Sequence, residues 1–255
     1  MPTTPQFDLT GKVAVITGGN GGIGRGIALG LAQAGASVAI LGRNDDKNRR
    51  VLAELKTIGA PAIAIELDVT NRAALDATIQ QVESCLGPVD ILVNNAGIAI
   101  LAGGALNEST EDWDRVIETN LNSVYLLSKI AARSMLTRKR GKIINIASMY
   151  SYFGSGLVPS YSAAKGALVQ LTKSLAIELA PHNIQVNAIA PGWFHTDMTA
   201  PVSSGPFYEE IILRTPAGRF GETEELAGTA VYLASRASDF VTGETIRVDG
   251  GYAIR

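Results

Sequence analysis

Residues 12–32 read KVAVITGGNGGIGRGIALGLA, and no other stretch of the chain is as informative. The apolar run KVAVIT is typical of a buried strand, and a helical pattern begins near residue 22. Between them, five of seven residues are glycine. Glycine permits a tight turn at Gly18, a close approach of backbone to a ligand at Gly22 and close packing of helix on strand at Gly24. Because the start of such a helix offers unpaired amide groups, the turn, which also holds Asn20 and Ile23, predicts a pyrophosphate site.

The same alternation of strand and helix continues to the end of the chain. The predicted strands are residues 12–17, 37–41, 62–68, 89–95, 143–148, 184–191 and 244–250. The predicted helices are residues 22–34, 45–58, 71–86, 109–138, 160–180 and 222–236. The strands are apolar runs with little polar alternation, which indicates burial on both faces. We therefore expect an α/β protein: a doubly wound (Rossmann) seven-stranded parallel sheet with helices on both faces.

No linker, repeat or low-complexity segment interrupts the pattern, so we expect one domain over residues 1–255, which binds the dinucleotide and carries the catalytic residues. The exception is the stretch 192–220, which is rich in proline, glycine and aromatic residues. We expect it to be a lid over a substrate site.

The composition excludes several classes of protein. The 22 basic and 24 acidic residues nearly balance, so no nucleic-acid or membrane partner is expected, and no apolar run reaches the roughly 18 to 20 residues that span a bilayer. A start without a secretory pattern and the single Cys85 favour a cytoplasmic location. Cys85 itself is expected to be a small buried residue late in a helix. With His182 and His195 as the only histidines, no metal site is expected.

The end of the second predicted strand decides which dinucleotide fits, because the ribose 2′ position lies there. An acidic side chain accepts a hydrogen bond from a 2′-hydroxyl, whereas arginine pairs with a 2′-phosphate. The strand ends in LGRN (41–44), which has no acid and contains Arg43. We therefore expect NADP(H) to be favoured and NAD(H) to be possible, since Arg43 can also be a solvated charge tempered by Asp45 and Asp46.

Two further strand ends complete the adenosine side. Asp68 ends the third strand, where its carboxylate can accept from the adenine amino group. The fourth strand ends in NNAG (94–97), whose small residues suit a backbone that meets a flat ligand.

Three polar side chains follow the fifth strand. Ser148 ends that strand, and Tyr161 and Lys165 lie four residues apart on one face of the next helix. Since ligands bind at the carboxyl ends of parallel strands, all three are expected beside the nicotinamide. A neighbouring ammonium and the positive nicotinamide of an oxidised cofactor stabilise the phenolate. We therefore expect the pKa of Tyr161 to be lowered and Tyr161 to act as general acid and base, with Ser148 aligning the substrate oxygen.

Taken in order, these motifs resemble those of the short-chain dehydrogenase/reductase family, in its shorter single-domain form. The matching motifs are Thr17-Gly18-x-x-x-Gly22-x-Gly24, Asn94-Asn95-Ala96-Gly97, Asn120 in ETNLNSVY, Ser148, Tyr161-x-x-x-Lys165 and Pro191-Gly192-x-x-x-Thr196, over essentially the full length. The resemblance implies that Asn120 is a fourth catalytic residue, which fixes a water linked to Lys165. It also implies that Thr196 and the backbone of 189–192 hold the nicotinamide carboxamide. The family usually forms tetramers through helices 109–138 and 160–180 and through the last helix and strand, so a homotetramer, or a homodimer, is implied.

The expected site residues fall into three groups. The catalytic residues are Asn120, Ser148, Tyr161 and Lys165. The cofactor-binding residues are Gly18, Asn20, Gly22, Ile23, Gly24, Arg43, Asp68, Val69, Asn95, Ala96, Gly97, Tyr161, Lys165, Pro191, Gly192 and Thr196. The substrate residues are Ser148, Tyr150, Tyr161, Trp193 and His195.

The substrate is expected to be a small alcohol or carbonyl compound. Residues 145–165 and 214–251 look most like bacterial enzymes acting on sugars and sugar acids, such as gluconate and deoxygluconate dehydrogenases, while 3-oxoacyl carrier-protein reductases share the C-terminal pattern. The aromatic residues Tyr150 and Trp193 instead favour ketones with an apolar substituent as substrates. Arg214, or His195 if protonated, can bind a carboxylate.

Two other functions remain open. The chain can be a sensor that binds a dinucleotide without chemistry, although the set of Asn120, Ser148, Tyr161 and Lys165 argues against it. A sugar-nucleotide epimerase or dehydratase would usually need a longer chain with a second substrate-binding region.

Overall fold

A computed structural model describes residues 4–255, so the first three residues of the expected domain 1–255 lie outside it. Its centre is one sheet of seven parallel strands in the order β3-β2-β1-β4-β5-β6-β7. The strands are β1 (Val13–Thr17), β2 (Ser37–Gly42), β3 (Ala62–Glu66), β4 (Ile91–Asn94), β5 (Gly141–Ile146), β6 (Ile184–Pro191) and β7 (Thr245–Val248). This is the predicted doubly wound fold, and the order reverses between β1 and β4.

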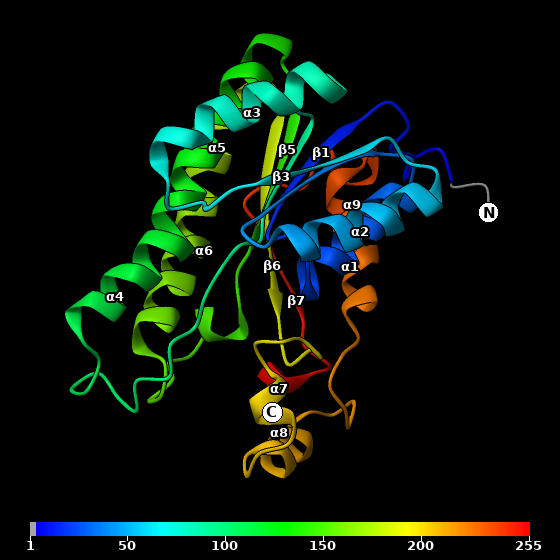
Figure 1. The fold of residues 1–255 in the computed structure, drawn as a ribbon. Helices are drawn as coiled ribbons and strands as arrows, with labels where there is room; N and C mark the ends of the chain where they lie inside the picture. Colours follow the sequence, from blue (N-terminus) through cyan, green and yellow to red (C-terminus); the bar gives the residue numbers. More distant parts are fainter. Residues whose placement is uncertain (1–3) are drawn as a thin grey trace.

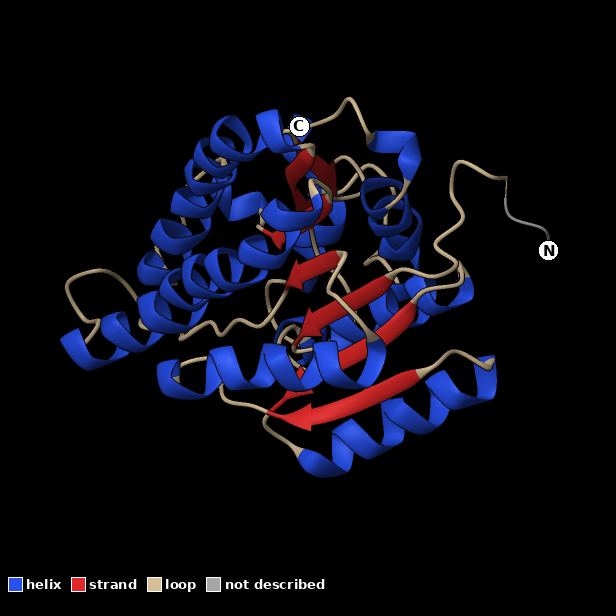
Figure 2. Cartoon of the chain, turned by 90° about the horizontal axis from the view of Figure 1, so that it is seen from above, coloured by secondary structure: helices blue, strands red, loops and turns tan. Residues whose placement is uncertain are grey.

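Helices cover both faces of the sheet (Figure 1). The α-helices are α1 (Gly22–Gln33), α2 (Asp45–Ile58), α3 (Arg72–Leu86), α4 (Thr110–Ile117), α5 (Ser123–Arg138), α6 (Pro159–Leu179), α7 (Ala200–Ser203), α8 (Tyr208–Arg214) and α9 (Ala227–Ala234). Helices α1, α2 and α9 lie on one side of the sheet, and α3, α5 and α6 lie on the other (Figure 1). Figure 2 shows the red strands enclosed between these two helical layers.

Each face has its own hydrophobic core. On the first face, Ile27 and Leu31 of α1 and Leu55 of α2 pack against the sheet. On the second, Ile79 of α3 and Leu127 of α5 do so. Strands β1, β5 and β6 are buried at every position, as their unbroken apolar sequences predict, whereas the edge strands β3 and β7 are partly exposed.

The predicted helix 109–138 is interrupted. A π-helix, η1 (Glu118–Asn122), separates α4 from α5. A π-helical turn inserts one extra residue and is often found at functional sites. Here it contains Asn120, whose side chain is fully buried. The predicted helix 222–236 is also divided, into the 3₁₀-helix η4 (Thr223–Leu226), α9 and the 3₁₀-helix η5 (Arg236–Ser238).

The segment 192–220 packs on the residues that follow Ser148. It contains α7 and α8, and its Ile211 and Phe220 form a small hydrophobic cluster with Met149 and Tyr252. In Figure 1 these two helices project beyond the carboxyl ends of the strands. The segment is therefore attached to the sheet through a separate, largely aromatic cluster.

Three surface observations complete the description. Cys85 is exposed, so the prediction that it is buried is wrong: late in α3, it lies outside the stripe of that helix that faces the sheet. In the stretch that the structure covers, no helix is long and apolar enough to cross a membrane. Nor do residues 4–255 bring together three or more His, Cys, Asp or Glu side chains that could hold a metal ion.

Candidate active site

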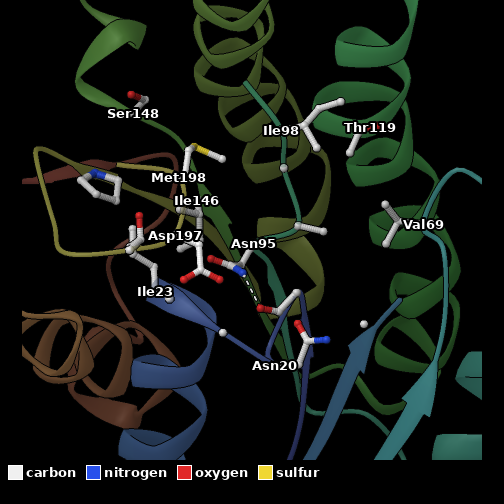
Figure 3. A pocket seen from close by; sticks show the side chains of 18 of the residues that line it. Asn20, Ile23, Val69, Asn95, Ile98, Thr119, Ile146, Ser148, Asp197 and Met198 are labelled. Carbon is white, nitrogen blue, oxygen red and sulfur yellow. Dashed lines mark hydrogen bonds between the residues drawn. The ribbon is translucent and has the colours of Figure 1, made fainter. Parts of the chain in front are cut away.

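A cavity of about 320 Å³ lies at the carboxyl ends of the strands, where the order of the sheet reverses. It is lined by segments that are far apart in the sequence: the turn after β1, the ends of β2 to β6, the start of α2, η1, the start of α6, and residues 194 and 196–199. Figure 3 shows side chains from these segments converging on the cavity. A crevice at this point of a parallel sheet is the general location for ligands in such folds.

The glycine turn forms one wall of the cavity. Gly18 and Gly22 have φ angles of +62° and +47°, which glycine adopts at little cost. A Cβ atom on Gly24 would lie 2.3 Å from the carbonyl oxygen of Gly18, so this residue serves close packing and does not line the cavity. The tight turn at Gly18 and the close packing at Gly24 are as predicted, and the approach of Gly22 to a ligand stays a prediction.

The fourth strand is tied to the glycine turn by hydrogen bonds. The hydroxyl of Thr17 accepts from the backbone N–H groups of Asn95 and Ala96, at 2.9 and 3.0 Å. The side-chain amide of Asn95 donates to the carbonyl oxygens of Thr17 and Gly18, at 2.9 and 3.1 Å (Figure 3). These bonds fix the two strand ends between which a dinucleotide would lie.

The adenosine side combines one exposed cation with one carboxylate. Arg43 is exposed, and its Nη1 lies 3.9 Å from Oδ2 of Asp68. The other carboxylate oxygen of Asp68 accepts from the backbone N–H and the hydroxyl of Thr70, at 2.9 and 2.7 Å. Burial alone would raise the pKa of Asp68, but the bonds from Thr70 and the charge of Arg43 hold it below its usual value. Asp68 is therefore ionised beside the place where Arg43 would meet a 2′-phosphate.

Ser148, Tyr161 and Lys165 meet along the opposite part of the cavity wall. Ser148 lies close enough to Tyr161 to lower the pKa of its phenol. The Nζ atom of Lys165 lies 5.6 Å from the centre of the Tyr161 ring and donates to the carbonyl oxygen of Ile146 at 2.6 Å. Ser148 and Lys165 are buried, so the three polar groups share a largely dry environment.

Burial shifts the pKa of both titrating groups. Desolvation raises the pKa of Tyr161 above its ordinary value of 10.0, and the side chain of Ser148 opposes that rise. Desolvation lowers the pKa of Lys165 from 10.5 to about 8. In the chain without a cofactor the pKa of Tyr161 is therefore raised, because desolvation outweighs the effect of Ser148. The expected lowering includes the charge of an oxidised nicotinamide and stays a prediction.

Asn120 is held by the backbone of one neighbouring residue. Its side-chain Oδ1 accepts from the N–H of Ile98 and its Nδ2 donates to the carbonyl of Ile98, both at 2.8 Å. These bonds link η1 to the loop after β4. Asparagine is unfavourable in helix interiors. The π-helical turn and the two hydrogen bonds to the Ile98 backbone account for the presence of Asn120 here.

Most of the predicted site residues line the cavity, but Gly24 and Asn120 do not, nor do the substrate candidates Tyr150, Trp193 and His195. Tyr150 packs edge to face on Tyr161 and on Trp193, with ring centroids 6.3 and 6.5 Å apart. His195 lies 5.3 Å from the ring of Phe220. These rings contact one another because the 192–220 segment folds onto the residues after Ser148.

The structure adds cavity residues that were not predicted. They are Gly21, Leu41, Gly42, Lys47, Leu67, Ile98, Thr119, Ile146, Ala147, Phe194, Asp197, Met198 and Thr199. Several of them lie next to a strand end or next to a predicted binding residue, and that position in the sequence could have identified them. Lys47 gave no such signal, because it reaches the cavity only through the packing of α2.

Comparison with known proteins agrees with this geometry. A family model described as enoyl-(acyl carrier protein) reductase matches residues 18–253. A 2-dehydro-3-deoxy-D-gluconate 5-dehydrogenase of Formosa agariphila is 43% identical over 248 residues, which cover 96% of this chain and 94% of the relative. A 5-keto-D-gluconate 5-reductase of Escherichia coli K12 is 43% identical over 250 residues, which cover 97% and 98%.

One solved structure is also closely similar. It is a gluconate 5-dehydrogenase from Burkholderia cenocepacia in complex with NADP and tartrate, with a TM-score of 0.94 and 39% identity over 98% of each chain. The match therefore includes the sheet, the glycine turn and the residues around the cavity. On this sequence and structural similarity, the chain belongs to the short-chain dehydrogenase/reductase family, a family of oxidoreductases.

Proposed function

We propose that the protein is an NADP(H)-dependent dehydrogenase or reductase that interconverts a secondary alcohol and a ketone on a sugar acid of the gluconate type. The observation that carries the proposal is the convergence of Ser148, Tyr161 and Lys165 on a cavity whose other wall is the glycine turn. A proton-transfer group beside a dinucleotide site is what hydride chemistry on an alcohol needs.

The cavity suits a dinucleotide. Gly18 and Gly22 have positive φ angles, and a Cβ there would lie 2.9 Å from Nδ2 of Asn95 or 3.2 Å from Cγ2 of Thr196. The turn thus presents bare backbone, as a bound pyrophosphate requires. Arg43 would pair with a 2′-phosphate, which favours NADP(H), and the similar structure from Burkholderia cenocepacia contains NADP. Thr196 and the backbone of Pro191 and Gly192 would hold the carboxamide. When bound, the nicotinamide accepts or supplies the hydride.

The side chains of this protein would move and stabilise the proton. In the direction of oxidation, the phenolate of Tyr161 accepts the hydroxyl proton of the substrate, and the hydroxyl of Ser148 donates a hydrogen bond to the same oxygen. The ammonium of Lys165, buried and 5.6 Å from the ring centre, favours the phenolate. Asn120, fixed by Ile98, would hold a water that connects Lys165 to solvent.

The sugar-acid assignment is supported by the relatives, which are named as gluconate-type dehydrogenases and reductases. Arg214 offers a cation for the carboxylate. Its guanidinium lies 5.2 Å from the centre of the Phe153 ring and 4.4 Å from that of Tyr252, and no acid of residues 4–255 lies within 4.0 Å of it. His195, 3.9 Å from Glu222, is less suited, because a carboxylate already faces it. The segment 192–220 would act as the substrate lid of this one-domain enzyme.

The fold weakens the argument for apolar ketones as substrates, which depends on the aromatic side chains of Tyr150 and Trp193. Tyr150 and Trp193 pack against each other and against Tyr161 and Phe220. Their apolar surface is thus partly used to hold the 192–220 segment on the sheet. A sugar acid fits this arrangement better than a ligand that needs a broad aromatic wall.

Exposed apolar side chains support assembly into a homotetramer. Trp113, Tyr125 and Leu136 on α4 and α5 and Ile177 on α6 are exposed, on the helices through which the family usually associates. A smaller assembly, a homodimer, would cover only part of this surface. The proposed location is the cytoplasm, where NADP(H) and sugar acids are available.

The proposal is tested by initial rates of nicotinamide absorbance change with gluconate and NADP⁺, and with 5-ketogluconate and NADPH. We expect turnover in both directions, and a loss of roughly 10²- to 10⁴-fold in kcat for Tyr161→Phe with unchanged NADP⁺ affinity. Tyr232→Phe, on α9 and outside the cavity, is the matched control. Tight binding of NADP⁺ without turnover of sugar acids, 3-oxoacyl esters or aromatic ketones would instead favour a dinucleotide sensor.

A further inference from the structure

The hydroxyl of Ser151 joins two catalytic segments of the site. Ser151 ends the 3₁₀-helix η2 (Met149–Ser151), one turn after Ser148. Its Oγ donates to the backbone carbonyl of Lys165 at 2.6 Å and accepts from the backbone N–H of Ser148 at 3.3 Å. One partly buried hydroxyl therefore uses its single hydrogen and one lone pair to connect η2 with α6.

Two neighbouring bonds complete the connection. The N–H of Tyr150 donates to the hydroxyl oxygen of Ser148 at 3.2 Å, which fixes the direction of that hydroxyl. The ammonium of Lys165 donates to the carbonyl of Ile146, two residues before Ser148. The backbone on both sides of Ser148 is thus bonded to Lys165, through its carbonyl on one side and its ammonium on the other.

From this geometry we propose that Ser151 is a positioning residue: it sets the hydroxyl of Ser148 at its working distance from Tyr161 and from the substrate oxygen. The proposal rests on the proposed oxidoreductase function and adds a residue that does not line the cavity itself. Its action passes through the backbone of Ser148 and of Lys165.

Removal of the Ser151 hydroxyl would leave the backbone N–H of Ser148 without its hydrogen-bond acceptor. Within residues 4–255, no other acceptor lies within hydrogen-bond distance of the N–H of Ser148, a residue that is 6% exposed. A buried donor without a partner is unfavourable, so η2 would shift to expose or re-pair it. A displacement of about 1 Å of a catalytic group can lower a rate by roughly 10²-fold.

A shift in the pH profile is also expected, because the side chain of Ser148 affects the pKa of Tyr161. It opposes the rise in that pKa which burial causes. If Ser148 moves away, the phenol needs a higher pH to lose its proton. The acidic limb of the kcat profile for oxidation should therefore move to higher pH in a Ser151 variant.

The experiment compares Ser151→Ala and Ser151→Thr with the natural enzyme. We expect Ser151→Ala to lower kcat roughly 10- to 100-fold, with little change in KM or NADP⁺ affinity, and to move the acidic limb upward. Ser151→Thr keeps a hydroxyl and should restore much of the rate. Ultraviolet titration of phenolate absorbance, corrected with Tyr161→Phe, should show the same upward shift without any cofactor.

The matched control is Ser162→Ala. Ser162 lies beside Tyr161 on α6, but its hydroxyl donates to Val158 within the first turn of the helix, at 3.1 Å. This variant should leave kcat and the pH profile unchanged. An active Ser151→Ala enzyme with an unshifted profile would overturn the proposal, as would a Thr variant as slow as the Ala variant. Failure of the proposed function is distinguished by a Tyr161→Phe enzyme that keeps its activity.

Discussion

The Nζ atom of Lys47 lies 2.5 Å from Oδ2 of Asp197, so an ion pair joins the first turn of α2 to the 192–220 segment. Both residues line the cavity, from walls that are 150 positions apart in the chain. The pair thus connects the adenosine side of the site to the segment that would cover the nicotinamide. Opening of that segment requires the pair to separate.

We expect Lys47→Gln and Asp197→Asn each to speed the release of NADP⁺. Both side chains are exposed, and such pairs contribute at most about 1 kcal/mol, so the off-rate should rise roughly two- to five-fold. The double variant should be no faster than the single ones, as measured by stopped-flow fluorescence. Arg133→Gln, which breaks the exposed pair with Asp76 away from the cavity, is the control. An unchanged off-rate for Asp197→Asn would show that the pair does not retain the cofactor.

Arg43 is expected to determine the preference for NADP(H). Loss of a charge-assisted bond typically costs about 1.5 to 3 kcal/mol, so Arg43→Leu should weaken binding of 2′,5′-ADP by roughly 10- to 100-fold. Binding of 5′-ADP, which lacks the 2′-phosphate, should change little. Arg49→Leu serves as the control because Arg49 is paired with Asp45 on the same helix and lies outside the cavity. Equal losses for both nucleotides in isothermal titration would contradict the assignment.

Gly24 is expected to tolerate no side chain. The Cβ of an alanine would lie 2.3 Å from the carbonyl oxygen of Gly18 and 2.4 Å from Nδ2 of Asn95. Gly24→Ala should therefore lower the free energy of unfolding by about 1 to 3 kcal/mol and weaken NADP⁺ binding, because the glycine turn must move. In Gly228→Ala, on α9, nothing lies within 4 Å of the new Cβ, and stability should rise by up to about 1 kcal/mol. Urea unfolding of both variants decides this prediction, and a Gly24→Ala protein of natural stability would refute it.

Lys165, which the proposed reaction needs, is expected to lower the free energy of unfolding because its ammonium is buried. Its pKa is about 8 in the folded chain, against 10.5 for a lysine side chain in water, so between these values the unfolded chain binds more protons and stability rises with pH. Below about pH 8 the buried ammonium costs on the order of 3 kcal/mol. Lys165→Met should be inactive yet more stable than the natural protein at neutral pH, by less than this amount because the bond to Ile146 is lost.

The stability gain of Lys165→Met should shrink as the pH rises from about 8 toward 10.5. Lys173→Met, at an exposed position of the same helix, is the control and should show no such trend. Thermal unfolding at several pH values provides the measurement. A gain that is the same at every pH would mean that the lysine is not desolvated in the folded state.

Local patterns in the sequence determined the sheet and the chemical residues of the site. Parallel strands buried on both faces require unbroken apolar runs, and β1, β5 and β6 show them. The turn around Gly18 and Gly22 requires glycine for its backbone angles. Such requirements act within a few residues, and they can therefore be recognised without knowledge of the fold.

The tertiary structure alone decided features that depend on contacts between distant segments. The interruption at η1 arises because Asn120 bonds to the backbone of Ile98, 22 residues away. The contact between Tyr150 and Trp193 joins two distant parts of the chain. The bridge from Ser151 to Lys165 and the pair of Lys47 with Asp197 have the same origin. Neither residue of such a pair has a local requirement for its partner, and only the packing of the elements brings the two together.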